Sequence, residues 1–353
     1  DAEELNAELL VFVDQEKPVK YALLTLKNPM MRSRRLYVTA CAEWVLGDVE
    51  RPGSIRVRFD GNIAFANNLR RSGPKQAYLT IAGSECEASG NLTETLSGGW
   101  AEDGSDEAFS ALRTQIVLEP GEERKLVILL GEDTEANAKR MAQCTPEGAL
   151  ERLEAVKRIW RDRLGRIRVT TPDEAMNIML NGWLMYQTWS ARLMGRTGYY
   201  QCGGAVGFRD QLQDILAIMP FEPERAKEHI LLAAARQFEE GDVLHWWHPP
   251  YSGVRTRISD DRLFLPYAVM EFIEVEGDPS ILDETAPYLD GEPIADCSRD
   301  LYCPMRPGDR QGSIYEHCTR AIDISLGRGA HGLALMGGGD WNDGMDRAGD
   351  GGG

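Results

Sequence analysis

The hydrophobic pattern of this 353-residue chain changes its period once, close to residue 132. Before that point apolar and polar residues alternate, as in the segment RRLYVTACAEWVLG that begins at Arg34. This is the period-2 pattern of a half-buried antiparallel strand. After that point apolar residues recur at the spacing of one helix face. The sequence therefore predicts a multidomain α and β protein in which strands come first and helices follow.

Residues 1–132 are predicted to form an antiparallel β-sandwich, because two stacked sheets bury one face of every such strand. The strand-like runs end at turn-forming pairs, namely Pro52-Gly53, Asp60-Gly61 and Pro120-Gly121. The first residues are already strand-like, so we expect the sandwich to be incomplete at its start. No cluster of candidate catalytic residues stands out within it.

Residues 133–170 are predicted to be a helical linker with a charged outer face, since apolar residues follow one side of the segment 148–164. A further helix is expected after Thr171 as N-cap, with Pro172 and Glu174 in the positions of a capping box. We expect one stripe of this helix to pack in the core. Its members are Met176, Met179, Leu180, Trp183, Gln187 and Met194.

Residues 171–353 are predicted to contain antiparallel helix pairs that close into an α/α barrel. Helix-length segments recur after residue 207, and long connections rich in Gly, Pro and aromatic residues separate them. Loops of this kind commonly carry function on a helical scaffold. An open helical solenoid is the alternative, but the sequence shows no repeat of fixed period that would favour it.

Two of these connections carry more polar side chains than packing requires. Their polar residues are Gln201, Arg209, Asp210, Gln211 and Asp214 in the first connection, and Arg255, Arg257, Asp260 and Asp261 in the second. Neighbouring Arg and Asp residues can offer bidentate hydrogen bonds to the vicinal hydroxyls of a sugar. They can equally form a buried ion-pair network with no ligand. The sequence alone leaves both interpretations open.

A third connection, HGLALMGGGDWNDGM from His331 to Met345, has the strongest character of a site. Its successive glycines allow the backbone to approach a ligand closely. The ring of Trp341 can pack on the C–H face of a pyranose, and a neighbouring carboxylate can deliver a proton to a glycosidic oxygen. The alternative is an ordinary turn, which Asp and Asn also favour.

The charge balance excludes some classes of partner. The chain has 56 acidic and 39 basic residues, a net charge of −17, whereas phosphate backbones and anionic membranes require clustered Lys and Arg. No run of 18 apolar residues exists, and the first residues lack the pattern of a secretory signal. We therefore expect no nucleic acid or membrane partner in this segment, and a cytoplasmic location.

The cysteines and histidines give no support for a disulfide framework or a metal site. The seven cysteines are odd in number and lack CxxC spacing, so we expect reduced thiols. His245 and His248 could form a metal pair on a helix, but the prolines that follow them indicate a chain end, and no acidic ligand pattern comes after. We expect no metal.

Several motifs, in order along the chain, resemble one enzyme family. These are YYQCGGAVGFRDQLQD, EGDVLHWWHPP, GVRTRISDD, YEHCTRAID and MGGGDWNDGM. They are similar to the cellobiose-phosphorylase family of inverting glycoside phosphorylases, glycoside hydrolase family 94, and in particular to its glucan-phosphorylase and cyclic β-1,2-glucan synthase-like branch. The resemblance extends from about Arg35 to the last residue. It implies a β-sandwich, a helical linker, an (α/α)6 barrel and a small C-terminal β element.

The resemblance also implies a chemistry. Inorganic phosphate, as co-substrate and without a cofactor, would cleave a β-glucosidic bond with inversion and give an α-sugar 1-phosphate. A single protein carboxylate then suffices, because phosphate replaces the water and the base of an inverting hydrolase. By motif match Asp343 is the general acid. Trp341, Arg255 and Asp261 match donor-sugar positions, and the further substrate-binding candidates are Arg257, Asp260, Asn342 and Gln201.

The expected partners are phosphate, a β-linked gluco-oligosaccharide or disaccharide and, as an option, a second copy of the chain in a homodimer. Family chains are much longer, so we expect residues 171–353 to be the first half of the barrel, with the phosphate-binding residues beyond residue 353. An inverting β-glucan hydrolase is an alternative, and would need a second carboxylate about 6.5–9.5 Å from the acid. Asp340, Asp260 and Glu316 are candidates for it. A non-catalytic carbohydrate-binding module is the other alternative.

Overall fold

The computed structural model describes residues 5–46, 54–70, 73–100, 108–195, 204–248, 252–295 and 300–335. The chain forms two compact units, unit 1 from Asp1 to Arg163 and unit 2 from Leu164 to Gly353. No helix within the described ranges is long and apolar enough to cross a membrane.

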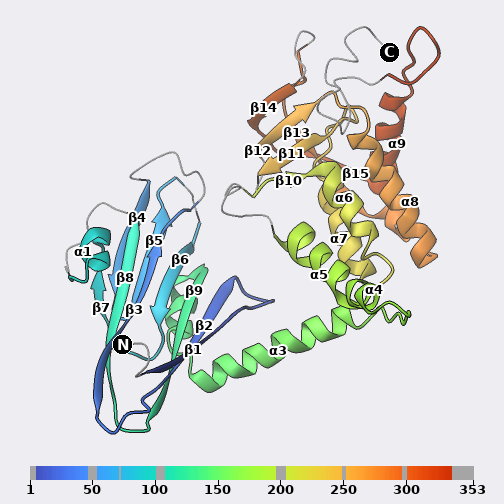
Figure 1. Cartoon of the computed structure of the whole chain (residues 1–353). Coiled ribbons are helices and arrows are strands. Elements are labelled where there is room, and N and C mark those ends of the chain that lie inside the picture. The colour runs from blue at the N-terminus through green and yellow to red at the C-terminus, as the bar shows by residue number, and fades with distance from the viewer. Residues whose placement is uncertain are drawn as a thin grey trace. The chain divides into compact units, whose positions relative to one another are not determined.

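Unit 1 contains two antiparallel sheets (Figure 1). The six-stranded sheet has the order β1 (Asn6–Val13), β2 (Val19–Lys27), β9 (Glu123–Thr134), β6 (Lys75–Ile81), β5 (Ile63–Asn68) and β4 (Ile55–Asp60). The three-stranded sheet has the order β3 (Arg34–Glu43), β8 (Phe109–Leu118) and β7 (Glu87–Ser89), and the short helix α1 (Leu92–Leu96) follows β7. The predicted antiparallel sandwich is confirmed.

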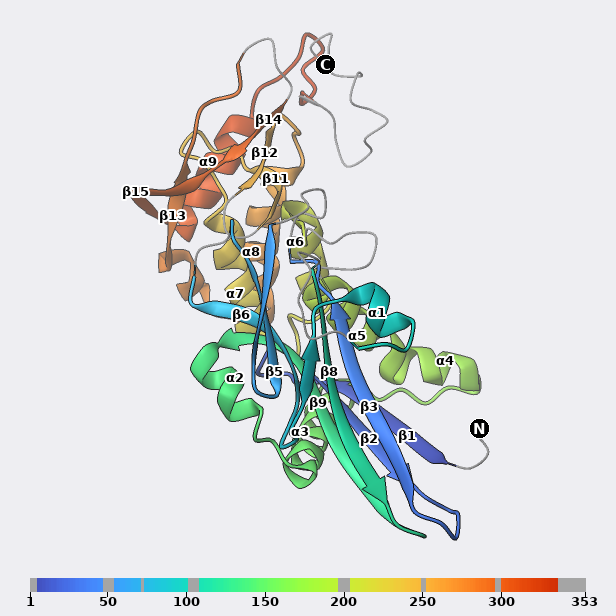
Figure 2. The same ribbon diagram turned by 90° about the vertical axis from the view of Figure 1, so that its left-hand side faces the viewer.

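The two sheets share one apolar core, in which Leu79 and Ile81 of β6 meet Ala40 of β3 and Leu112 of β8. A second core covers the opposite face of the six-stranded sheet. There Tyr78 packs with alanines of α2 (Glu135–Met141) and α3 (Pro146–Leu164), and α2 lies beside the sheet in Figure 2. The expectation of one buried face per strand is therefore wrong for β5 and β6, which helices and a second sheet bury on both faces.

The helix α3 has the charged outer face that the sequence predicts. Ala149, Leu153 and Val156 are buried along one side of it. Arg152 donates two hydrogen bonds to the fully buried carboxylate of Asp14, at 2.6 and 2.8 Å, and so connects α3 to the turn after β1. The segment predicted as a linker thus packs against the strands of unit 1.

Unit 2 begins with a helical segment whose turns alternate between α and π geometry. It runs through α4 (Glu174–Ile178), a π turn (Met179–Trp183), α5 (Leu184–Gln187) and a second π turn (Thr188–Met194). Its N-cap is Asp173, whose side chain accepts hydrogen bonds from the backbone N–H groups of Ala175 and Met176. The expectation that Thr171 caps this helix is therefore wrong.

The expectation that one stripe of this segment packs in the core is also wrong in the structure. Met176, Met179, Trp183 and Met194 are 40–50% exposed, and Gln187 is exposed too. The buried side chains are Met185, Trp189 and Leu193. The physical reason is that π turns have more residues per turn than α turns, so a face extrapolated at period 3.6 does not persist through them.

Four further helices confirm the helix-length segments predicted from the sequence. They are α6 (Phe208–Leu216), α7 (Pro223–Ala234), α8 (Phe264–Glu276) and α9 (Ile314–Ser325). Each presents an apolar face to the interior, where Phe208, Ile230, Leu265 and Ile314 are fully buried. The helix α9 starts with a complete capping box between Ser313 and Glu316.

The connections between these helices differ from the expected loops, because they contain strands. One antiparallel sheet has the order β10 (Val206–Gly207), β11 (Leu244–His248), β12 (Ser252–Thr256) and β14 (Asp300–Pro304), and a second pairs β13 (Thr285–Asp290) with β15 (Arg306–Ser313). Both sheets lie next to the helices of unit 2 (Figure 1). The aromatic segment around Trp246 is therefore held in a sheet, which fixes the side chains described below.

Candidate functional site

The polar residues of the site come from β11, β12 and the short 3-10 turn Asp261–Leu263 that precedes α8. Leu244 of β11 lies opposite Arg255 of β12, but the next pair in register is Trp246 and Val254. One residue of β11, His245, is therefore an additional residue in a β-bulge. A bulge redirects the side chain that it carries. It also shifts by one residue the alternation of the β11 side chains between the two faces of the sheet.

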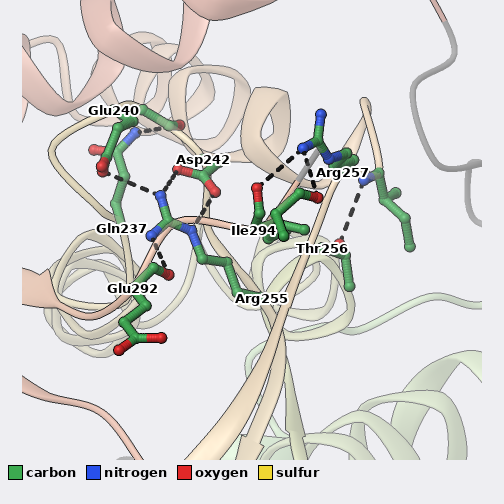
Figure 3. Close-up of polar contacts among 11 residues, drawn as sticks. Gln237, Glu240, Asp242, Arg255, Thr256, Arg257, Glu292 and Ile294 are labelled. Carbon is green, nitrogen blue, oxygen red and sulfur yellow. Dashed lines mark hydrogen bonds and ion pairs between the residues drawn. The ribbon is translucent and has the colours of Figure 1, made fainter. Parts of the chain in front are cut away.

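Arg255 is buried and bound on all sides (Figure 3). Its Nε and Nη2 atoms donate to the two carboxylate oxygens of Asp242, at 2.6 and 2.7 Å. Nη2 also donates to Glu240 at 3.1 Å, and Nη1 donates to the backbone carbonyl of Glu292 at 3.0 Å. The ring centroid of Phe238 lies 3.7 Å from the guanidinium carbon.

These contacts show the ion-pair network that the sequence left as an alternative. Four hydrogen bonds occupy four of the five N–H groups of a guanidinium, so Arg255 keeps at most one for a ligand. Its burial acts to lower its pKa, but Asp242 and Glu240 outweigh that effect and raise it. Arg255 is therefore a fixed cation that holds β12 to the segment before β11.

Asp261 and His245 form a second polar pair. The Nδ1 atom of His245 lies 2.6 Å from Oδ2 of Asp261, whose side chain is 2% exposed, while that of His245 is 31% exposed. Burial raises the pKa of Asp261, and the hydrogen bond and charge of His245 act against this rise. The pair joins the bulge of β11 to the turn that starts α8.

Asp260, the neighbour of Asp261, binds Arg209 of α6. The Nη1 atom of Arg209 donates to Oδ2 of Asp260 at 2.6 Å, and its guanidinium lies over the ring of Phe264 at 4.6 Å. Asp260 acts to raise the pKa of Asp261, whereas Arg209 acts to lower it. Arg262, which donates to Ser325 at 2.7 Å, is influenced by the charges of both Asp242 and Asp261. The two polar pairs therefore belong to one charged cluster.

Arg257 lies apart from Arg255 and its acidic partners and points to Ile294, as Figure 3 shows. It is exposed and donates to the backbone carbonyls of Ile294 and Ala295, at 3.1 and 3.2 Å. Arg255, Asp260 and Asp261 thus each have charged or ionisable partners within this part of unit 2, while Arg257 contacts the chain after β13. The candidates Gln201, Trp341, Asn342 and Asp343 lie outside the described residues, as does Asp340.

An aromatic cluster covers the other face of the sheet. Trp246 of β11 and Tyr302 of β14 lie on the same row across the strands, and their ring centroids are 5.8 Å apart. The ring of His248 meets that of Trp246 edge-on at 5.4 Å. Aromatic ring faces of this kind can pack against the C–H groups of a sugar.

His245 and His248 lie on the strand β11, and not on the helix on which the sequence would place a metal pair. Nδ1 of His245 contacts Asp261. The part of the chain that the structure describes contains no group of three His, Cys, Asp or Glu residues able to hold a metal ion. Glu316, one candidate for a second carboxylate, accepts a backbone hydrogen bond in the capping box of α9.

Sequence reasoning missed Asp242 and Glu240 as partners of Arg255, and it considered His245 only as a possible metal ligand. Their signal is present in the stretch EEGDVLHWWH, where acidic residues and a histidine precede two tryptophans. Gly241 has φ +100°, and a side chain added there would meet the backbone of Arg320 at 2.5 Å. This glycine lets the acidic turn fit closely against α9, so that Asp242 reaches Arg255.

Comparison with known proteins gives two family matches within the chain. The model of the glycosyl hydrolase 94 superfamily catalytic domain matches residues 159–353, and the model of the glycosyl hydrolase 94 supersandwich domain matches residues 1–91. A solved structure of human-microbiome origin, provisionally named a kojibiose phosphorylase, has a TM-score of 0.52 at 10% identity, covering 79% of this chain and 41% of that one. At this identity the likeness concerns the fold alone.

Three curated relatives are similar in sequence. The cyclic β-(1,2)-glucan synthase NdvB of Rhizobium meliloti (strain 1021) is 38% identical over 99% of this chain. The solabiose phosphorylase of Paenibacillus borealis is 28% identical over 97% of this chain. The N,N'-diacetylchitobiose phosphorylase of Vibrio furnissii is 25% identical over 66% of this chain. The chain spans 13%, 45% and 31% of these relatives, respectively.

Proposed function

The chain belongs to the glycosyl hydrolase 94 superfamily, and from this we propose that it carries the donor-sugar side of an inverting β-glucoside phosphorylase. The observation that carries the proposal is the match of the catalytic-domain model over residues 159–353, together with relatives named as phosphorylases. The substrate proposed is a β-linked gluco-oligosaccharide or disaccharide. The name of NdvB makes a β-1,2-linked glucan the first substrate to test.

In the proposed reaction, inorganic phosphate attacks the anomeric carbon from the face opposite the leaving group. Asp343 donates a proton to the glycosidic oxygen as the C–O bond breaks, and the product is an α-sugar 1-phosphate with inverted configuration. Phosphate is the nucleophile, so the reaction needs no second catalytic carboxylate. We propose phosphate as a co-substrate and no cofactor.

The candidate residues divide into two proposed roles. Asp261 is a buried carboxylate that can accept hydrogen bonds from sugar hydroxyls, and Trp341 is proposed to pack on the sugar ring. Arg255 keeps at most one N–H group for the sugar. We therefore expect it to act mainly by fixing β12 and the turn that carries Asp261. Asp260, Arg257, Asn342 and Gln201 remain proposed substrate contacts.

The test is the reaction of the full-length protein with β-1,2-linked gluco-oligosaccharides, with and without phosphate, followed by NMR of the products. The wild type is expected to give α-glucose 1-phosphate only when phosphate is present. Asp343→Asn replaces the acid by an amide of nearly equal volume and should lower the rate by about 10²–10⁴-fold, with Asp340→Asn as the matched control. Glucose released equally without phosphate would instead identify a hydrolase, and an Asp343→Asn rate above a tenth of wild type would exclude Asp343 as the acid.

A further inference from the structure

His245 occupies a position that an ordinary strand would not give it. The register changes between Leu244 and Trp246, which lie opposite Arg255 and Val254, so His245 is the additional residue between two consecutive register pairs. Leu244 and Trp247 fill the core beside this position, whereas His245 turns its ring toward the 3-10 turn that precedes α8. The bulge therefore places Nδ1 of His245 within hydrogen-bond distance of Oδ2 of Asp261.

The receiving carboxylate is deeply buried, since Asp261 is 1% exposed. Oδ2 takes the hydrogen bond from Nδ1 of His245 at 2.6 Å. Within the described ranges, Oδ1 has no side-chain partner. A carboxylate buried in this way needs a donor to remain oriented and charged, and the imidazole of His245 supplies one.

We propose that His245 is a positioning residue for the donor-sugar site: its imidazole holds the Asp261 carboxylate in the orientation and charge state in which it accepts sugar hydroxyls. The inference rests on the proposed function, because it takes Asp261 as the sugar-binding group. His245 acts through Asp261, and no contact between His245 and the sugar is required.

The charges around Asp261 determine how the loss of His245 would appear. Arg209 of α6, Asp260 and Arg262 of the adjoining turn, and His245 of β11 all influence it. Burial and Asp260 raise the pKa of Asp261, while His245 and Arg209 lower it. Without the imidazole the pKa of Asp261 rises, so a smaller fraction of it is ionised at mildly acidic pH. The acidic limb of the activity profile should therefore move to higher pH.

The experiment uses the full-length protein and measures phosphate release from α-glucose 1-phosphate with a β-1,2-linked gluco-oligosaccharide as acceptor, across pH. His245→Phe keeps the ring shape and removes the donor. It should raise the KM for α-glucose 1-phosphate, lower kcat/KM by about 10- to 100-fold and shift the acidic limb to higher pH. His245→Asn places an amide N–H where Nδ1 was and should recover most of the loss. His229→Phe is the matched control, because His229 also loses a hydrogen bond of its Nδ1, to Gln211 at 2.9 Å, but is not a partner of Asp261.

Each outcome decides the inference. It is overturned if His245→Phe behaves like His229→Phe, or if its loss is equal at every pH and His245→Asn does not recover it, since a purely structural role would give that result. If thermal denaturation shows that His245→Phe does not fold, a folded His245→Asn variant more than about tenfold below wild type in kcat/KM overturns it. The Asp343→Asn variant in the same assay distinguishes failure of the proposed function from failure of this inference. An active Asp343→Asn variant contradicts the proposed function. An inactive Asp343→Asn variant together with a His245→Phe variant of normal activity contradicts only the role of His245.

Discussion

The two units of the chain bury different kinds of side chain. Within the described residues of unit 1, the buried side chains are apolar or uncharged polar groups, and Asp14 is the one buried acidic or basic residue. Unit 2 buries Arg236, Arg255 and Asp261 together with two histidines, His229 and His317. Burying a charge costs free energy unless it is paired and hydrogen-bonded. The charged interior of unit 2 is therefore not explained by stability, and two of its residues, Arg255 and Asp261, belong to the candidate site.

The two units specify the geometry of their interiors in different ways. The core of unit 1 needs apolar groups of suitable volume, and such cores tolerate exchange. The interior of unit 2 needs particular atoms: Gln237 accepts from His317 Nδ1 at 2.7 Å and donates to two backbone carbonyls at 3.0 Å each. A substitution in unit 2 thus removes a defined partner and leaves another polar group buried without it.

The largest effect on stability should come from Asp242→Ala. This substitution leaves the 2% exposed guanidinium of Arg255 without its bidentate partner, and breaking a buried pair in this way costs about 3–5 kcal/mol. The free energy of unfolding from urea denaturation measures it. Glu240→Ala is the control, because Glu240 is 55% exposed and should matter much less. Equal effects of the two substitutions would mean that burial of the partner does not determine the cost.

A smaller effect is expected for Asp14→Ala in unit 1. Asp14 is buried but its partner Arg152 is 31% exposed, so water can replace the lost bond at Arg152 and the cost should be about 1–3 kcal/mol. Burial raises the pKa of Asp14, but hydrogen bonds from Arg152 and from the backbone of Glu16 outweigh this and lower it. A carboxyl with a lowered folded-state pKa stabilises the protein above its unfolded value of 3.8.

The contribution of Asp14 should therefore be complete at neutral pH and disappear as the pH falls through its folded-state pKa. Thermal denaturation of wild type and Asp14→Ala from pH 7 downward checks the sign, and Glu16→Ala, at 66% exposure, is the control. A difference between wild type and Asp14→Ala that grows toward acidic pH would contradict the assignment.

The smallest effect should be that of Lys139→Met. Lys139 lies 2.8 Å from Asp60 and 2.9 Å from Glu135, and all three side chains are exposed by more than 40%. Exposed pairs of this kind add little to stability and are screened by salt. We expect no resolvable change in Tm at physiological ionic strength. A clear loss of stability would show that unit 1 also relies on charge, and would weaken the contrast between the units.

The sequence predicted an element correctly where its hydrophobic pattern is compatible with only one kind of secondary structure. Alternation predicted β3 as observed, and period 3.6 predicted α6 to α9. It was insufficient where atoms far apart in the chain determine the outcome. The burial of β5 and β6 on both faces depends on α2 and α3. The π turns that begin at Met179 displace a helix face extrapolated at period 3.6.

The candidate site shows the same division. Arg255 and Asp261 were identified by motif, but their partners were not, because Asp242 and His245 reach them only through a glycine turn and a bulge. A bulge has no distinct composition, so its position follows from the register of β11 against β12. The sequence could not decide whether Arg255 contacts a sugar or belongs to an ion-pair network. The hydrogen bonds of Arg255 in the structure show the network.

The strand order of unit 1 also determines when its fold can appear during synthesis. Val19 of β2 pairs with Gly131 of β9, so the second strand waits for a neighbour that the ribosome produces more than a hundred residues later. The alanines that cover Tyr78 come later still, in α2 and α3. A sheet closed by such distant pairs folds slowly, and its early strands stay open to wrong partners until α3 emerges.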